Sequence, residues 1–258
     1  MSKPLILVTN DDGVYAPGIA ALIEVAKKLG DVVVIAPDKA QSGMGHAITI
    51  NSTLRMHKIK EYDVLHEYAC SGTPVDCVKL AVNKVLHRKP DLCISGINHG
   101  PNMSISVIYS GTMSAAVEGA IEEIPSIGFS LFDYSHEADF STSKIIAEKI
   151  CRNVLEKGLP KGVCLNVNIP AVPEIEIKGI KVCRQTKGNW VEELDERKDP
   201  AGNQYFWLTG RFQNFEPDAE DTDVWALKNN YVSVVPVQFD MTSYKAMDEI
   251  QKWGNEKF

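Results

Sequence analysis

The first 158 residues alternate short apolar runs with helical stretches, and this rhythm limits the fold more than any other feature. The predicted strands are 5–9, 32–36, 67–70, 92–95 and 126–130. The predicted helices are 17–30, 74–85, 112–122 and 143–155. Strands separated by helices in this way predict an α/β fold, with a parallel sheet covered by helices on both faces. Such a sheet binds its ligands beyond the carboxyl ends of its strands.

The second part of the chain has a weaker pattern. It contains short predicted strands, an acidic stretch at 216–223 and a final predicted helix near Ser243–Trp253; the strands are 162–168, 179–183, 204–208 and 231–237. We interpret it as an antiparallel extension of an α/β core. The expected division places the core at about 1–158 and the extension at about 159–258, with oligomerisation as the extension's expected role.

Composition excludes several classes of partner. The formal net charge of the 258-residue chain is −7, which offers no electrostatic footprint for duplex nucleic acid or an anionic membrane. No apolar run is long enough to span a bilayer. The six cysteines form no C-x-x-C pair, and several lie inside apolar runs, as buried free thiols do. Together with the absence of a recognisable export signal, these features predict a cytoplasmic protein.

Two adjacent carboxylates follow the first predicted strand, in the sequence Asn10-Asp11-Asp12-Gly13. If both are buried, they repel each other unless a cation compensates their charge. Hard divalent metals prefer oxygen ligands and suit such a pair. The alternative is an exposed turn, because Asn, Asp and Gly are also typical turn residues.

Two further polar loops follow later strands. Ser42-Gly43-Met44-Gly45-His46 combines a small hydroxyl with two glycines, which let the backbone approach an anion or a metal. His46 is a candidate general acid, although a lone loop histidine is more often structural. In 95–102, Asn98 offers a neutral oxygen to a metal and Asn102 an amide to a substrate. The alternatives are an ordinary flexible loop at 42–46 and a plain turn at 95–102.

A fourth motif, Tyr109-Ser110-Gly111-Thr112, opens the helix at 112–122. Hydroxyls and free backbone N–H groups at a helix N-terminus form an anion site. The alternative is a Ser or Thr cap with nothing bound. A parallel sheet would gather all four motifs at one edge. A carboxylate pair, neutral oxygens and a phosphate cradle are together what metal-assisted phosphoester hydrolysis requires.

These motifs, in this order and spacing, resemble the SurE survival-protein family of 5′/3′-nucleotidases. The resemblance rests on Asn10–Gly13, Ser42-Gly43, Ser71–Asp76, Ser95–Asn102, Tyr109–Thr112, Thr222-Asp223 and Tyr231–Ser233, so it spans nearly the whole chain. It implies a single SurE-like domain over 1–258, with a Rossmann-like core and a C-terminal extension exchanged between subunits of a homodimer or homotetramer.

The resemblance also implies an activity and its residues. Family members remove phosphate from nucleoside 5′- and 3′-monophosphates, and some degrade short polyphosphate. One divalent metal per subunit, Mg²⁺ or Mn²⁺, would be held by Asp11, Asp12, Ser42 and Asn98. The substrate phosphate would be held by Asn102, Ser110, Gly111 and Thr112. Asp11 and Asp12 are the catalytic candidates, and Asp11 is either a ligand only or also a base or nucleophile.

The sequence departs from the family pattern in three places. Met103–Ser106 replaces the usual glycine and acidic residue, Asn230 replaces a glycine, and Arg184–Lys187 matches poorly. The resemblance therefore leaves the oligomer contacts and the recognition of the base open. Adjacent carboxylates argue against haloacid-dehalogenase phosphatases, which require D-x-D. The remaining alternatives are a nucleotide-binding module without turnover and a nicotinamide-dependent oxidoreductase, which the absence of G-x-G-x-x-G disfavours.

Overall fold

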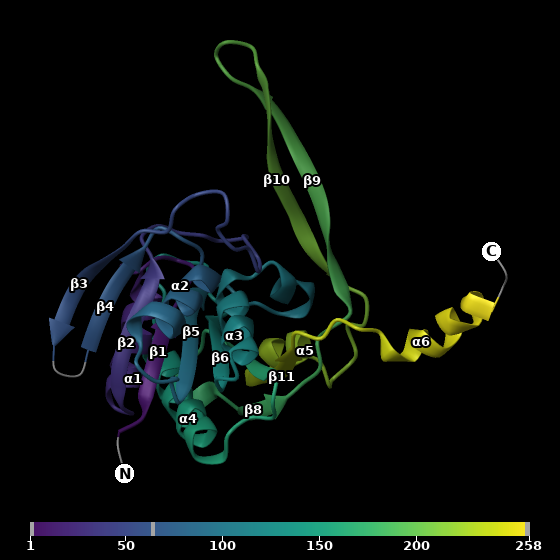
Figure 1. Cartoon of the computed structure of the whole chain (residues 1–258). Coiled ribbons are helices and arrows are strands. Elements are labelled where there is room, and N and C mark those ends of the chain that lie inside the picture. Colours follow the sequence, from purple (N-terminus) through teal and green to yellow (C-terminus); the bar gives the residue numbers. More distant parts are fainter. Residues whose placement is uncertain (1–2, 63–64, 256–258) are drawn as a thin grey trace.

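A nine-stranded sheet forms the centre of the computed structural model, which describes residues 3–62 and 65–255 (Figure 1). The strands are arranged in the order β3-β4-β2-β1-β5-β6-β7-β11-β8. Their bounds are β1 (Leu5–Thr9), β2 (Asp31–Pro37), β3 (Met56–Tyr62), β4 (Leu65–Cys70), β5 (Leu92–His99), β6 (Ser126–Leu131), β7 (Val163–Ile169), β8 (Gly179–Val182) and β11 (Tyr231–Gln238). The six strands from β4 to β7 all run parallel, which confirms the predicted α/β class.

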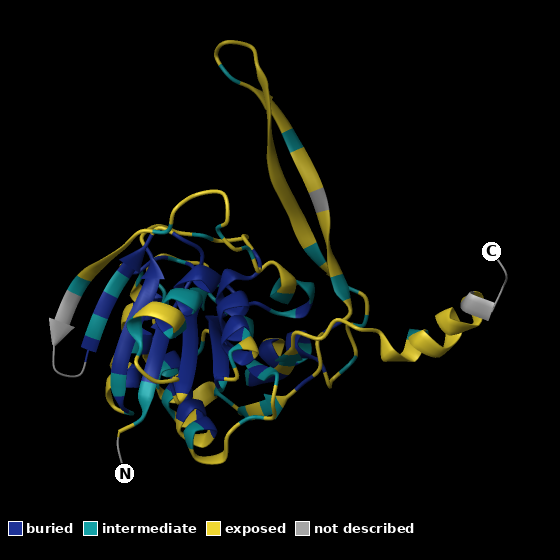
Figure 2. Cartoon of the chain, in the orientation of Figure 1, coloured by how far each residue is buried: buried dark blue, intermediate teal, exposed yellow. Residues whose placement is uncertain are grey.

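Helices cover both faces of this sheet. On one face lie α1 (Pro17–Lys27) and α4 (Ser141–Lys157), and on the other α2 (Pro74–Leu80) and α3 (Gly111–Ile121). Within β1, Ile6 and Val8 belong to the α1–α4 side of the core, whereas Leu7 belongs to the α2–α3 side. A strand with apolar residues pointing both ways needs cover on both faces, which explains the continuous apolar run in the sequence. Figure 2 shows this dark-blue, buried centre.

The position of β1 determines where a ligand can bind. It lies between β2 and β5 and runs parallel to both. The chain first builds outward through β2 and β4, and then returns to the other side of β1 to form β5. Open α/β sheets bind ligands at this kind of reversal, beyond the carboxyl ends of the two strands. The ends of β1 and β5 are where the predicted acidic and asparagine motifs lie.

The main sheet continues past residue 158. Strand β7 pairs with β6 in parallel and with β11 in antiparallel orientation, as the predicted extension requires. The prediction is wrong for β8, which pairs with β11 in parallel. Antiparallel pairing needs only a short turn between strands, but β8 and β11 are separated by the whole segment 183–230, so either direction is open to them. A short helix that the sequence analysis missed, α5 (Asp223–Lys228), packs on β11.

Two elements extend away from the body. An antiparallel hairpin of β9 (Gly188–Lys198) and β10 (Gln204–Asn214) forms a separate two-stranded sheet, and α6 (Tyr244–Gln251) follows an extended segment (Figure 1). Both are largely exposed in Figure 2. The sequence predicted α6 and the first part of β10, but not β9. Within the described residues, every helix is too short or too polar to cross a bilayer.

Several boundaries differ from those predicted. Strand β5 extends to His99, so Asn98 lies on a strand end and not in a loop. Helix α1 ends at Lys27, three residues before Gly30. The predicted start of α2 is confirmed, because Thr73 and Asp76 form a capping box.

Candidate active site

The carboxyl end of β1 turns sharply and buries Asp11. Asn10 donates its side-chain amide to the Gly13 carbonyl at 2.9 Å, and the Val14 amide donates to the Pro37 carbonyl at 2.8 Å. Gly13 has φ +101°, a left-handed conformation that favours glycine, and lies against the backbone that follows β2. The predicted alternative of an exposed turn does not hold for Asp11, whose side chain is 3% exposed.

The start of α3 packs directly on Asp11. Thr112 donates its hydroxyl to Oδ1 of Asp11, and a Cβ at Gly111 would lie only 2.6 Å from Cβ of Asp11. Glycine at position 111 is therefore what lets the helix approach this carboxylate. Burial raises the pKa of Asp11 to about 6, the Thr112 hydrogen bond opposes this change, and the charge of Asp12 adds to it.

Asp12 faces the end of β5. Burial raises its pKa, and the charge and backbone N–H of His99 partly oppose that rise. The ring of His99 is held in place. Its Nδ1 lies 2.9 Å from the Ser135 carbonyl oxygen, and it forms a T-shaped contact with the ring of Phe140, with 5.2 Å between centroids. His99 was not among the site residues predicted from the sequence, although its position directly after Asn98 was a signal that could have found it.

Asn98 presents its oxygen rather than its nitrogen. The side-chain amide donates to the carbonyls of His99 at 3.0 Å and Gly100 at 2.7 Å. Because both N–H groups are occupied in this way, Oδ1 is the atom available to a cation.

The loop that contains Ser42 is anchored to the same edge. The Gln41 amide donates to the Asp11 carbonyl at 2.7 Å, and the Gly45 amide donates to the Tyr109 carbonyl at 3.1 Å. Ser42 itself is exposed. The structure thus connects the Ser42 loop to both the Asp11 turn and the segment that precedes α3.

His46 has a partner that sequence reasoning missed. Its Nε2 lies 2.9 Å from Oε2 of Glu118, a residue of α3 with a side chain only 2% exposed, and Lys79 of α2 pairs with the other oxygen. Burial raises the pKa of Glu118, but the hydrogen bonds from His46 and Lys79 outweigh it and leave the pKa lowered. Of the two roles considered for His46, this contact favours a structural one.

The predicted phosphate residues have defined roles in the fold. Ser110 caps α3 by accepting a hydrogen bond from the Met113 amide at 3.0 Å, as the alternative interpretation of this motif expected. Asn102 is buried, donates its side-chain amide to Ser130 at 2.9 Å and is held through its backbone by Asn166 and Asn168. The backbone N–H groups of Gly111 and Thr112 lie in the first turn of α3, where no earlier carbonyl of the helix can accept from them.

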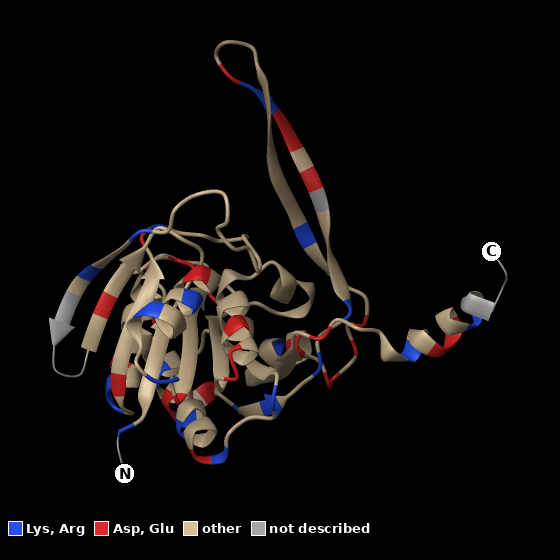
Figure 3. Ribbon diagram, in the orientation of Figure 1, with Lys and Arg blue, Asp and Glu red and all other residues tan. Residues whose placement is uncertain are grey.

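The site offers oxygen ligands of the kind that a hard divalent cation prefers. Within the described residues, no three His, Cys, Asp or Glu side chains are grouped to hold a metal, so a ligand set here must combine Asp11 and Asp12 with neutral oxygens. The segments 40–54 and 92–117, which contain the site loops together with β5 and the first part of α3, have no Asp, Glu, Lys or Arg (Figure 3). A bound phosphate would therefore find no basic side chain on these loops, and a cation would supply the missing positive charge. The residues present fit the metal that the family resemblance implies.

The fold and this edge define an α/β protein with an acidic pair at a topological switch point. The profile of the family "Survival protein SurE" matches residues 6–192, and the chain belongs to the SurE family. A protein of Flavobacterium psychrophilum named "5'-nucleotidase SurE" is 62% identical over 258 residues, with 100% of both chains covered. A protein of the same name from Chlorobaculum tepidum is 44% identical over 252 residues, covering 98% of this chain and 95% of its own. The crystal structure of Sure protein from Aquifex aeolicus has a TM-score of 0.84 at 43% identity, covering 98% and 100%.

Proposed function

We propose that this SurE-family chain is a metal-dependent 5′-nucleotidase that removes phosphate from nucleoside monophosphates. One Mg²⁺ or Mn²⁺ per subunit would be held by Asp11, Asp12, Ser42 and Asn98. The observation that carries the proposal is the burial of Asp11 beside Asp12, with neutral oxygens and no basic side chain on the surrounding loops. The nucleotide substrate is supported by full-length relatives named for that activity.

The protein's own residues would divide the work as follows. Thr112 orients Asp11 through its hydroxyl, and Asn98 turns its oxygen outward because both amide hydrogens are used. The residues at the start of α3, Ser110, Gly111 and Thr112, together with Asn102, would bind phosphate oxygens and stabilise the charge that builds on them. When bound, the metal would polarise a phosphoryl oxygen and acidify water. Asp11 would act as a metal ligand, and it is also the candidate to accept the proton of the attacking water.

We extend the proposal to the assembly and the compartment. Exposed apolar side chains on β9, β10 and α6 support a homodimer or homotetramer, including Leu194, Phe206, Trp207, Leu208, Met247 and Ile250. All six cysteines are buried and free, as in a reducing compartment, which supports the cytoplasm. The family resemblance also implies activity on 3′-nucleotides and, in some members, on short polyphosphate, and the test includes both substrates.

The test is phosphate release by the Mn²⁺- or Mg²⁺-loaded protein from 5′- and 3′-nucleotides and short polyphosphate, with and without EDTA. We expect EDTA to abolish release and Asp12→Asn to reduce kcat/KM by at least about 100-fold, the scale of losing one key charge stabiliser. The control is Asp38→Asn, an exposed carboxylate at the end of neighbouring β2, which should leave the rate within about twofold.

Two results would contradict the proposal. Full metal-dependent activity in Asp12→Asn would show that the site lies elsewhere. Nucleotide binding without turnover by the metal-loaded wild type would favour the binding-module alternative.

A further inference from the structure

A hollow of about 460 Å³ lies between the base of the hairpin and the loops of the candidate active site. It is lined by Gly43, Tyr109, Trp190, Leu208, Thr209 and Gly210. Three separate segments therefore form its walls: the loop after β2, the segment before α3, and the β9–β10 hairpin.

The hollow adjoins the proposed metal and phosphate residues. Gly43 directly follows Ser42, and Tyr109 directly precedes Ser110. The hydrogen bond from the Gly45 amide to the Tyr109 carbonyl connects these two walls at 3.1 Å. The part of a bound nucleotide beyond its phosphate needs a site near these residues, and this hollow adjoins them.

Trp190 is held in position on the hairpin side. Its Nε1 donates to the Ser106 hydroxyl at 3.2 Å, and its ring meets Phe212 edge-on at 6.1 Å between centroids. Its side chain remains 37% exposed, and that of Tyr109 is 50% exposed. Both aromatic rings thus keep surface available for a ligand.

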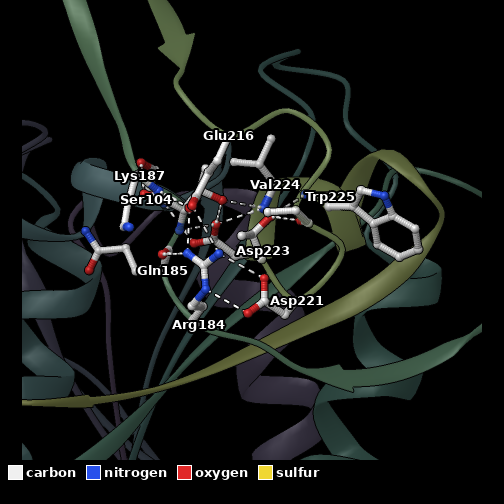
Figure 4. Close-up of polar contacts among 12 residues, drawn as sticks. Ser104, Arg184, Gln185, Lys187, Glu216, Asp221, Asp223, Val224 and Trp225 are labelled. Carbon is white, nitrogen blue, oxygen red and sulfur yellow. Dashed lines mark hydrogen bonds and ion pairs between the residues drawn. The ribbon is translucent and has the colours of Figure 1, made fainter.

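The base of the hairpin is clamped to the body, which keeps Trp190 in place (Figure 4). Arg184 pairs with Glu216 and Asp221, and Glu216 also accepts from the Lys187 amide at 2.7 Å. The buried carboxylate of Asp223 accepts from the Ser104 amide at 2.8 Å and the Thr186 amide at 3.0 Å.

The segment that contains Ser106 and the segment that enters β9 are therefore both held by the carboxylate of Asp223. A site that is ordered before the ligand arrives loses less entropy on binding.

The chemistry of the walls indicates a flat, uncharged ligand. None of the described lining residues is charged, and the hydroxyl of Thr209 donates to the Glu193 carbonyl at 3.0 Å. Aromatic rings bind nucleobases by stacking, which tolerates every base because each has a π-face. We propose that the nucleobase of the substrate binds in this hollow, against Tyr109 and Trp190, with little discrimination between bases. This inference rests on the proposed nucleotidase function and adds its base-binding subsite.

The experiment compares two substrates that differ in the base. For the Mn²⁺-loaded protein, kcat/KM is measured for AMP and for ribose 5-phosphate, which has the same phosphate and sugar without a base. We expect Trp190→Ala and Tyr109→Ala each to lower the ratio of the two values about fivefold or more, through a higher KM for AMP. That change corresponds to ~1 kcal/mol at 1.36 kcal/mol per tenfold, the lower end for stacking on one aromatic ring. Trp190→Phe should restore most of the ratio.

The matched control is Phe215→Ala, an exposed aromatic residue directly after β10 that neither lines the hollow nor belongs to the surface proposed for oligomerisation. Its ratio should equal that of the wild type. A second readout avoids catalysis: calorimetric titration of the EDTA-treated protein with adenosine should show weaker binding in Trp190→Ala and Tyr109→Ala than in Phe215→Ala.

The outcomes separate this inference from the function on which it rests. If the wild type hydrolyses neither substrate, the nucleotidase proposal fails and the inference with it. If it hydrolyses both and the ratio does not change in Trp190→Ala and Tyr109→Ala, only the base site is wrong. A changed mass in solution with an unchanged ratio would assign the hollow to contacts between copies of the chain.

Discussion

At the scale of single residues, the unusual feature is a carboxyl group buried where its charge is unfavourable. The carboxylate of Asp11 accepts hydrogen bonds from the Thr112 hydroxyl and from the backbone N–H groups of Thr112 and of Asp11 itself, has a charged neighbour in Asp12, and has almost no contact with solvent. These hydrogen bonds do not compensate the cost of burial, because the pKa is still raised to about 6. A cation at this edge would change that balance, so folding, pH and metal binding should be linked through this side chain.

The first prediction concerns the metal-free protein. Since the pKa of Asp11 is higher in the folded state than the usual 3.8, the folded state keeps its proton longer. Asp11 should therefore have no effect on stability below pH 4. As the pH rises from 4 to about 6, Asp11 should progressively lower the free energy of unfolding. Above pH 6 the total loss should be about 3 kcal/mol.

The measurement is urea unfolding in EDTA at several pH values. Asp11→Asn keeps an oxygen for Thr112 but cannot ionise, so the variant should lack this loss of stability. If the free energy of unfolding of the wild type and of the variant changed with pH in the same way, burial would not raise the pKa of Asp11, and the prediction would be wrong. In the wild type, Mn²⁺ affinity should weaken as the pH falls below 6, because the metal requires the ionised form.

At the scale of elements, Glu118 connects three of them. It is a buried acid on α3, and its partners are the more exposed His46 of the Ser42 loop and Lys79 of α2. The helix whose first turn packs on Asp11 thus also anchors, by its third turn, the loop that carries another proposed ligand. Removing the partners leaves a buried charge that water cannot reach. Removing the buried charge leaves only exposed partners, which water can hydrate, so the loss of stability is smaller.

The second prediction follows from that asymmetry. The double variant His46→Ala/Lys79→Met leaves Glu118 buried without these partners and should lose about 3 kcal/mol of unfolding free energy. Glu118→Gln leaves only the more exposed His46 and Lys79 without their charged partner, and should lower the unfolding free energy by about 1 kcal/mol. Urea unfolding of both variants measures these two losses of free energy. Equal losses would contradict the prediction.

A third prediction concerns the same loop. His46→Ala alone should weaken Mn²⁺ binding, measured by calorimetry, because the Ser42 loop loses one anchor while Glu118 keeps Lys79. The control is His87→Ala, an exposed histidine outside this cluster, which should bind Mn²⁺ as the wild type does. Unchanged affinity in His46→Ala would mean that the hydrogen bonds of Gln41 and Gly45 suffice to hold the loop.

At the scale of the whole molecule, α6 extends away from the body and none of its described residues is buried (Figure 2). An isolated helix of eight residues is not stable in water, so it needs a surface to pack on. Its exposed side chains include Tyr244, Met247 and Ile250. A second copy of the chain would supply such a surface, as the proposed oligomer requires.

The fourth prediction is therefore a change of mass. We expect wild-type protein to have the mass of a dimer or tetramer in multi-angle light scattering. Met247→Glu/Ile250→Glu should shift that mass toward a smaller species, because two charges would enter the contact. Lys245→Glu, a charge change on the same helix, is the control. A monomeric wild type would contradict the role proposed for the extension.

Local sequence patterns were enough to predict the α/β class, most of the strands and helices of the first 158 residues, and the edge of the sheet where the polar loops lie. These features depend on neighbours within a few residues: apolar periodicity, helix caps such as Thr73 and Ser110, and the rule that parallel strands end together. The placement of Asn98 on a strand end was missed, because strand ends depend on pairing and not on local composition.

Contacts between distant residues could not be predicted in this way, because they form only when the chain has folded. Residues far apart in the chain meet in four places: His46 pairs with Glu118, α3 approaches Asp11, β8 pairs in parallel with β11, and Trp190 and Tyr109 line one hollow. Such contacts depend on which surfaces remain after the sheet and its helices have packed, and no local pattern in one sequence carries that information. A buried acid in a helix, or a tryptophan on an exposed hairpin, has a defined partner only when the fold supplies one.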